Sequence, residues 1–154
     1  MKKTVGFGVV LLVGMSAAGC AQSSPEQSAG DSELKPSATI SLASLRGQWE
    51  GADAARNGED LRNFSSVTMT VNDDGAFQVT TGCNDPRGTF TVNDDGILSI
   101  DGPVITTRMA CDPALMDMDT LVTDVLEGIS GATLTESGEL QIVGDHGALT
   151  FQRE

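Results

Sequence analysis

Residues 66–82 read SVTMTVNDDGAFQVTTG, and this stretch decides the fold class. Apolar side chains alternate with threonines from Val67 to Val71, and the alternation resumes around Phe77 after the turn Asn72–Gly75. Successive side chains of a strand point to opposite faces, and an Asp-Gly turn between two alternating runs is typical of a β-hairpin. The stretch therefore predicts two antiparallel strands with one apolar face.

The same pattern recurs along the chain. Residues 88–101, GTFTVNDDGILSID, alternate around a second turn at Asn93–Gly96. Two further hairpins are predicted to turn at Ser137-Gly138 and at Asp145–Gly147, and a strand is predicted within 46–52, RGQWEGA. We therefore expect a mainly β (α+β) domain, with seven to eight short strands in a compact antiparallel sheet or small barrel.

Residues 111–130, CDPALMDMDTLVTDVLEGIS, predict one helix instead. Asp112 suits the N-cap, Pro113 the first turn and Gly128 a left-handed stop. One face is apolar at helical spacing, through Leu115, Met118, Leu121, Val122, Val125 and Leu126, and the opposite face carries Asp117, Thr120, Asp124 and Glu127. The helix is expected to pack on the sheet with an acidic outer face, and Met116 and Met118 are expected to fill gaps in the core.

The N-terminal residues predict export. Lys2 and Lys3 precede a short apolar run, and the small residues SAAG end immediately before Cys20. This order is typical of a lipoprotein signal peptide at 1–19, after which Cys20 carries a diacylglycerol thioether and palmitate-type acyl chains. The alternative is an ordinary secretory cleavage site beside an unrelated cysteine.

Composition divides the rest of the chain and limits its partners. Residues 20–40 are rich in Ser, Ala, Gln, Glu and Pro and predict a flexible tether, which leaves one domain at 41–154. The chain has 22 acidic and 9 basic residues; without Lys2 and Lys3 the count is 22 against 7, a formal charge of −15. Such a charge repels nucleic acid and anionic head groups, so neither is expected as a partner.

Two similar stretches contain the remaining cysteines. Residues 80–87 read TTGCNDPR and residues 106–113 read TTRMACDP. If Cys20 is acylated, Cys83 and Cys111 form an even pair in a compartment that permits disulfides. We expect them to be bonded, which would stabilise the fold by about 3 to 4 kcal/mol; two buried free thiols are the alternative. Two cysteines without close spacing do not predict a metal site.

These stretches resemble the META domain, also called the HslJ-like domain, of bacterial envelope lipoproteins. The resemblance covers about 45–152 and rests on Gly82, Cys83, Asn84, Gly88, Thr107, Arg108, Met109 and Cys111. It implies a compact β-rich fold with one helix and a connection with envelope or stress physiology, and it implies no catalytic activity. The glutamate often found in the family's helix is replaced here by Asp117 or Asp119.

The residue pattern predicts no catalytic residue and no cofactor. Asp73-Asp74 and Asp94-Asp95 suit hairpin turns, and His146 has no nucleophile at a recognisable spacing. Arg108 is expected to be structural, through a salt bridge or hydrogen bonds near Asp85 or Asp112.

Three classes of function remain. We expect a monomeric, non-enzymatic lipoprotein on the outer side of the cell membrane, anchored through Cys20 and acting on an envelope protein through surface contacts. The alternative is a small-ligand or inhibitor module with a lipocalin-like barrel, whose mouth would lie near Trp49 and Arg108. A hydrolase would require His146 to meet a nucleophile in the fold.

Overall fold

The computed structural model describes residues 37–61 and 63–154, and these described residues belong to one compact unit. The predicted signal peptide 1–19 and Cys20 lie outside the described residues, as does most of the predicted tether 20–40. Its last residues do not fit a tether, because Ser37–Ala38 form strand β1 and Ile40 is buried in the core. The ordered domain therefore includes residues before the expected boundary at 41.

The sheet is antiparallel, and the predicted mainly β architecture is confirmed. In chain order its strands are β1 (Ser37–Ala38), β2 (Gly47–Arg56), β3 (Glu59–Asp60), β4 (Thr68–Val71), β5 (Ala76–Thr80), β6 (Arg87–Val92), β7 (Leu98–Ile100), β8 (Ile129–Thr135), β9 (Glu139–Gly144) and β10 (Gly147–Arg153). The number of strands exceeds the predicted seven to eight because β1 and β3 have only two residues each.

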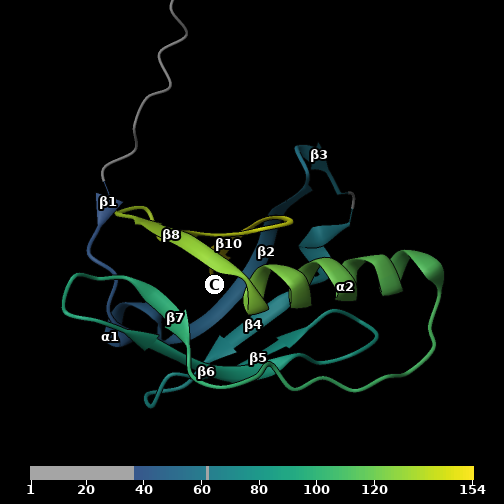
Figure 1. Cartoon of the computed structure of the whole chain (residues 1–154). Coiled ribbons are helices and arrows are strands. Elements are labelled where there is room, and N and C mark those ends of the chain that lie inside the picture. The colour runs from purple at the N-terminus through teal and green to yellow at the C-terminus, as the bar shows by residue number, and fades with distance from the viewer. Residues whose placement is uncertain (1–36, 62) are drawn as a thin grey trace, which may run out of the picture. The chain divides into compact units, whose positions relative to one another are not determined.

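The strands lie in the order β1-β8-β9-β10-β2-β4-β5-β6-β7, and β3 pairs with the far end of β2. All four predicted hairpins form, as β4–β5, β6–β7, β8–β9 and β9–β10. The sheet curls so that β7, at one end of this order, returns beside β8 (Figure 1). The result is a half-barrel rather than a flat sheet.

Three helical segments accompany the sheet: α1 (Leu42–Leu45), the 3₁₀ turn η1 (Phe64–Ser66) and α2 (Pro113–Glu127). The predicted ends of α2 are confirmed, since the Asp112 side chain accepts the Ala114 N–H and Gly128 is the C-cap. Gly128 has φ −112°, so the expected left-handed stop is wrong. Helix α2 packs on β9 and β10 through its apolar face (Figure 1).

The core fills the concave side of the sheet. Two aromatic pairs are buried there: Phe77 stacks on Phe90 with ring centroids 4.2 Å apart, and Phe64 meets Phe151 edge-on at 5.2 Å. Trp49 is also fully buried; its Nε1 donates to the Leu45 carbonyl oxygen at 2.8 Å. Packed aromatic and aliphatic side chains therefore occupy the interior, where a lipocalin-like barrel would have an open ligand cavity.

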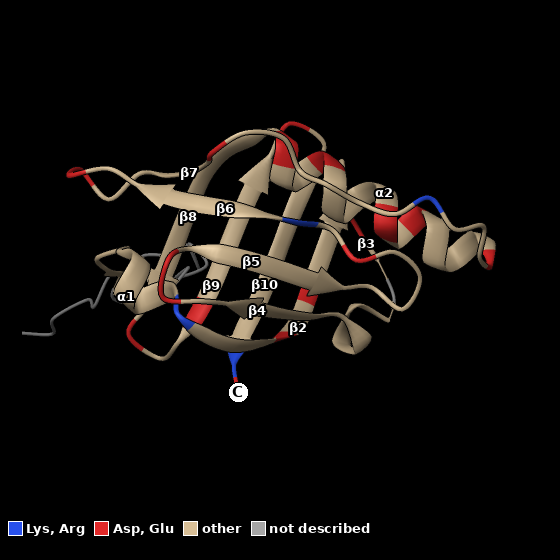
Figure 2. Ribbon diagram, turned by 90° about the horizontal axis from the view of Figure 1, so that it is seen from below, with Lys and Arg blue, Asp and Glu red and all other residues tan. Residues whose placement is uncertain are grey.

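Acidic residues lie on the outer face of α2 and at the hairpin turns, where few basic residues accompany them (Figure 2). Asp74 accepts the Ala76 N–H at 3.0 Å, and Asp73 lies 3.0 Å from the Arg46 guanidinium. The acidic pairs therefore occupy turns, as predicted. No helix in the described part of the chain is long and apolar enough to cross a membrane.

Candidate functional site

The two cysteine-containing stretches meet at one end of the sheet. Cys83 follows β5, Cys111 directly precedes the N-cap of α2, and the two are joined in a disulfide with their Cα atoms 6.0 Å apart. The predicted pairing is confirmed. Because the bond closes a separation of 28 residues, it joins the β5–β6 connection to the start of the helix.

Asn84 connects the same two stretches by hydrogen bonds. Its side-chain Oδ1 accepts the Met109 N–H at 2.9 Å and the Thr107 hydroxyl at 2.6 Å, while its Nδ2 reaches the Met109 carbonyl oxygen at 3.4 Å. One buried amide thus satisfies both backbone groups of Met109, as a neighbouring strand would. The segment 107–109 is fixed in this way without belonging to any strand.

Asp119 of α2 completes the arrangement from the helix side. Its carboxylate accepts the Asn84 Nδ2–H at 2.5 Å and the Asn84 backbone N–H at 3.2 Å, and it also contacts the Thr81 hydroxyl. The side chain is buried, and a buried carboxylate requires such donors. Asn84 and Asp119 therefore form the centre of a polar network that holds β5, segment 107–109 and α2 together.

Asp119 was not identified as an inward residue by the sequence pattern. It lies on the buried face of α2 beside Met118 and Val122, whereas Asp117 is exposed. The spacing of Leu115, Asp119, Val122 and Leu126 along one face contained this signal. Of the two aspartates considered as replacements for the family's helix glutamate, Asp119 is the one that reaches the motif residues.

Steric constraints explain why glycine occupies the two motif positions 82 and 88. Gly82 adopts φ +91°, which side chains with a Cβ rarely allow. Gly88 pairs with Phe77 across β5 and β6, and a Cβ on Gly88 would come within 2.9 Å of the Phe77 ring. Gly82 therefore permits the turn into Cys83, and Gly88 leaves room for the buried ring.

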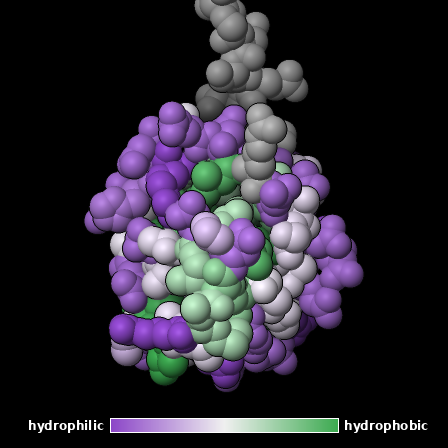
Figure 3. All heavy atoms as spheres, turned by 90° about the vertical axis from the view of Figure 1, so that its right-hand side faces the viewer, coloured by the Kyte–Doolittle hydropathy of each residue, from purple (hydrophilic) through white to green (hydrophobic). Residues whose placement is uncertain are grey.

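A hollow of about 410 Å³ lies over this network, between segment 106–110 and α2. Asn84 and Asp119 contribute to its lining, and Arg108, Met109 and Met116 surround them. Met109 is 54% exposed and Met116 is 37% exposed, so the expected core role of Met116 is wrong, while Met118 is buried as expected. Figure 3 faces the end of the molecule where the chain enters α2, and a moderately hydrophobic strip lies there among hydrophilic groups.

The structure contradicts the structural role expected for Arg108. In residues 37–61 and 63–154, Arg108 takes part in no hydrogen bond, ion pair or ring contact, and its side chain is exposed. Arg153, by contrast, has a structural role, because it donates to the carbonyl oxygens of Arg46 at 2.9 Å and Ser44 at 2.5 Å. Arg153 also lies 4.4 Å from the ring centroid of Trp49.

Other candidate groups do not join the hollow. Trp49 lies buried in the core and is absent from the lining that Arg108 shares. His146 is exposed at the β9–β10 turn, in a shallow site whose lining includes Asp145 and Asn57 but no serine or cysteine. Among the described residues, no three His, Cys, Asp or Glu side chains are placed to hold a metal ion.

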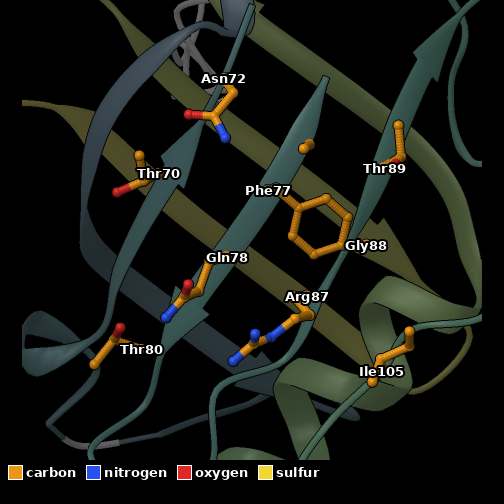
Figure 4. Close-up of a pocket in the computed structure, with 10 residues that line it drawn as sticks. Thr70, Asn72, Phe77, Gln78, Thr80, Arg87, Gly88, Thr89 and Ile105 are labelled. Carbon is orange, nitrogen blue, oxygen red and sulfur yellow. The ribbon is translucent and has the colours of Figure 1, made fainter. Parts of the chain in front are cut away.

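A second hollow, of about 560 Å³, lies on the outer face of β4, β5 and β6. Figure 4 shows Thr70, Gln78, Thr80 and Arg87 along its sides, with the Phe77 ring beside Gly88. Gln78 Nε2 is 3.4 Å from Asp85 Oδ2. Of the motif residues, only Gly88 contributes to this surface, so the motif as a whole does not build it.

Comparison with known proteins agrees with this arrangement. The family model described as "META domain" matches residues 41–154. A protein from Burkholderia xenovorans, solved by NMR, is similar with a TM-score of 0.60 and 23% identity, over 81% of this chain and 96% of that one. Another protein solved by NMR has a TM-score of 0.54 and 19% identity, over 73% of this chain and 94% of its own.

These two likenesses show the fold. None of the curated proteins compared with the chain matches it. The family model covers strands β2 to β10, α2 and both halves of the Asn84–Asp119 network. The chain therefore belongs to the META domain family.

Proposed function

We propose that this protein is a non-enzymatic envelope lipoprotein, anchored through a lipid on Cys20, whose META domain binds a partner protein at the hollow between segment 106–110 and α2. The monomeric domain would carry out this role in envelope or stress physiology, as its family resemblance implies. The observation that carries the proposal is the combination of exposed Met109, Met116 and Arg108 with a rigid frame beneath them.

The side chains around the hollow suit recognition better than packing. Methionine and arginine are enriched at protein interfaces, and unbranched methionine adapts to different partner surfaces. Arg108 has no partner within the described residues, so its charge and donors are free for a ligand group. A carboxylate or a row of carbonyl oxygens on the partner would match it.

The frame reduces the entropy lost on binding. The disulfide, the Asn84 amide and the Asp119 carboxylate fix both walls of the hollow before any partner arrives. A preorganised surface binds more tightly because fewer groups become ordered on association. Buried hydrophobic side chains line the interior of the sheet, and this supports recognition at the surface over a lipocalin-like ligand site.

Site-specific photocrosslinking in intact cells tests the partner site. A photoreactive residue at Thr123, which lines the hollow, should give a discrete crosslinked product, whereas one at Asp95 on the β6–β7 turn should not. Adding Arg108→Ala to the Thr123 probe should weaken the product while protein level and melting temperature stay unchanged. Equal products from both positions, or none from Thr123, would contradict the proposed site.

The anchor is tested separately. Cys20→Ser should abolish incorporation of labelled fatty acid and move the protein out of the membrane fraction, because stable attachment depends on the acyl chains. Ser24→Ala, in the same region, should leave labelling unchanged. Continued labelling of the Cys20→Ser protein would show that the anchor was wrongly assigned, and that result would not affect the hollow.

A further inference from the structure

A third sulfur atom lies beside the disulfide. The Met116 Sδ lies 3.9 Å from the Cys83 Sγ, and Met109 lines the same hollow as Met116. The other described methionines, Met69 and Met118, are buried in the core. Both exposed methionines of the described residues therefore lie at this end of the fold, Met116 contacting Cys83 through its sulfur and Met109 through its carbonyl oxygen, and filling the core does not explain either side chain.

We infer that reduction of the Cys83–Cys111 disulfide creates a binding site for Cu(I), with the two thiolates and the Met116 thioether as ligands. Thiolate and thioether sulfur together select this soft monovalent ion over harder cations. Within the described residues, the groups that contact the Cys83 sulfur besides Cys111 are the Met116 thioether, the Asn84 amide and the Met109 carbonyl oxygen, and Asn84 lies between this sulfur and the Asp119 carboxylate.

The separations fit a shared metal. Sulfur ligands lie about 2.3 Å from a bound metal, and two of them at the corners of a trigonal site are then about 4 Å apart. The separation of Cys83 Sγ and Met116 Sδ, 3.9 Å, already meets this value. Cys83 and Cys111, with Cα atoms 6.0 Å apart, can both turn their sulfurs toward the same point.

The frame keeps these groups in place when the bond is broken. Asn84 holds Met109 through two backbone hydrogen bonds, and Asp119 holds Asn84, and none of these contacts includes a sulfur. The Asn84 Nδ2 also lies 3.3 Å from Cys83 Sγ and can donate to a thiolate there. Cys111 directly precedes the N-terminus of α2, which favours a negative sulfur.

An external thiol can supply the two electrons that reduce the Cys83–Cys111 disulfide. One external thiolate attacks the partly exposed Cys111 Sγ, which breaks the bond to Cys83 and releases Cys83 as a thiolate. A second external thiolate attacks the mixed disulfide, and Cys111 leaves as a thiolate while an external disulfide forms. Two external thiols are oxidised, their two protons pass to solvent, and the bound copper remains Cu(I).

The test uses the mature protein carrying Cys20→Ser, so that Cys83 and Cys111 are its only cysteines. The protein is reduced with a phosphine, desalted without oxygen, and titrated with Cu(I) against a coloured Cu(I) chelator. We expect one Cu(I) per reduced chain and no competitive binding by the oxidised chain. X-ray absorption should show three sulfur neighbours at about 2.3 Å.

Matched variants separate this site from a simple pair of thiolates. Met116→Leu should lower the Cu(I) affinity by about tenfold or more, since it removes one ligand, whereas Met118→Leu should leave the affinity unchanged. Trp49 fluorescence reports whether each reduced variant is folded. If folded Met116→Leu binds Cu(I) as the parent does, if only two sulfurs are found, or if the oxidised chain binds equally well, the inference is wrong. Tighter binding of Zn(II) than of Cu(I) would also overturn it.

Discussion

Replacing Asn84 by alanine is expected to destabilise the domain more than any surface substitution. Asn84 is 4% exposed, and its side chain bonds to Thr107, to both backbone groups of Met109 and to the Asp119 carboxylate. Alanine removes all of these side-chain hydrogen bonds at once. It also leaves the Asp119 carboxylate with fewer donors in a buried position.

The magnitude follows from these contacts. A neutral hydrogen bond contributes about 0.5 to 1.5 kcal/mol net, and a bond to a charged group about 1.5 to 3 kcal/mol. Water entering from the adjacent hollow will replace part of what is lost, so we expect a loss of about 3 kcal/mol rather than the full sum. For a domain of this size, the melting temperature should fall by about 12 °C.

Urea unfolding followed by Trp49 fluorescence is the suitable assay, because Trp49 is the single tryptophan and is fully buried. Asn72→Ala, at the exposed β4–β5 turn, is the matched control and should change stability by less than about 0.5 kcal/mol. In a double-mutant cycle, Asn84→Ala and Asp119→Ala together should cost about 1 to 3 kcal/mol less than the two single losses added. A loss below about 1 kcal/mol for Asn84→Ala, or strict additivity in the cycle, would refute the network as a stabilising unit.

The remaining predictions concern the disulfide, the two arginines and the strand glycine. Cys83→Ser should lower the free energy of unfolding by about 2 to 5 kcal/mol, and Cys83→Ser with Cys111→Ser should cost little more, because the first change already breaks the bond. If the double variant loses twice as much, the two sulfurs stabilise the fold independently. Arg108→Ala should leave stability within about 0.5 kcal/mol of the parent, whereas Arg153→Ala should lose about 1 to 2 kcal/mol with its hydrogen bonds and its contact with Trp49. Thermal melts of the two variants compare them directly, and a reversed order would show that the roles are misassigned. Gly88→Ala should cost about 1 to 3 kcal/mol by overpacking the Phe77 ring, while Gly131→Ala, where a Cβ meets nothing within 4 Å, should be tolerated; equal melting temperatures would argue against the steric reading of Gly88.

Features that depend on neighbouring residues were predictable from the sequence. Alternation around Asn72–Gly75 and Asn93–Gly96 located two hairpins, because turn and strand preferences act over a few residues. Asp112 and Pro113 located the start of α2 for the same reason. The disulfide was predictable because, once Cys20 is assigned to the lipid, Cys83 and Cys111 are the only two cysteines left to pair.

Features that depend on remote contacts were not predictable in this way. Alternation identifies strands but does not identify their neighbours, so the pairing of β2 with β10 was not expected. The role of Asn84 depends on partners at Thr107, Met109 and Asp119, which only the folded chain brings together. Arg108 was expected to bond near Asp85 or Asp112 because it is one of few cations in an acidic domain, but within the described residues it makes no such contact.

The place of β10 in the sheet has a consequence for how the chain folds. This last strand lies between β9 and β2, and Glu154 still donates its N–H to the Gln48 carbonyl oxygen. The hairpin β4–β5 and its neighbours can form early from local contacts, but β2 has no partner on its other side until residues 147–153 have been synthesised. Completion of the sheet therefore waits for the synthesis of residues 147–153, and a variant truncated before β10 should remain soluble only with the help of a chaperone.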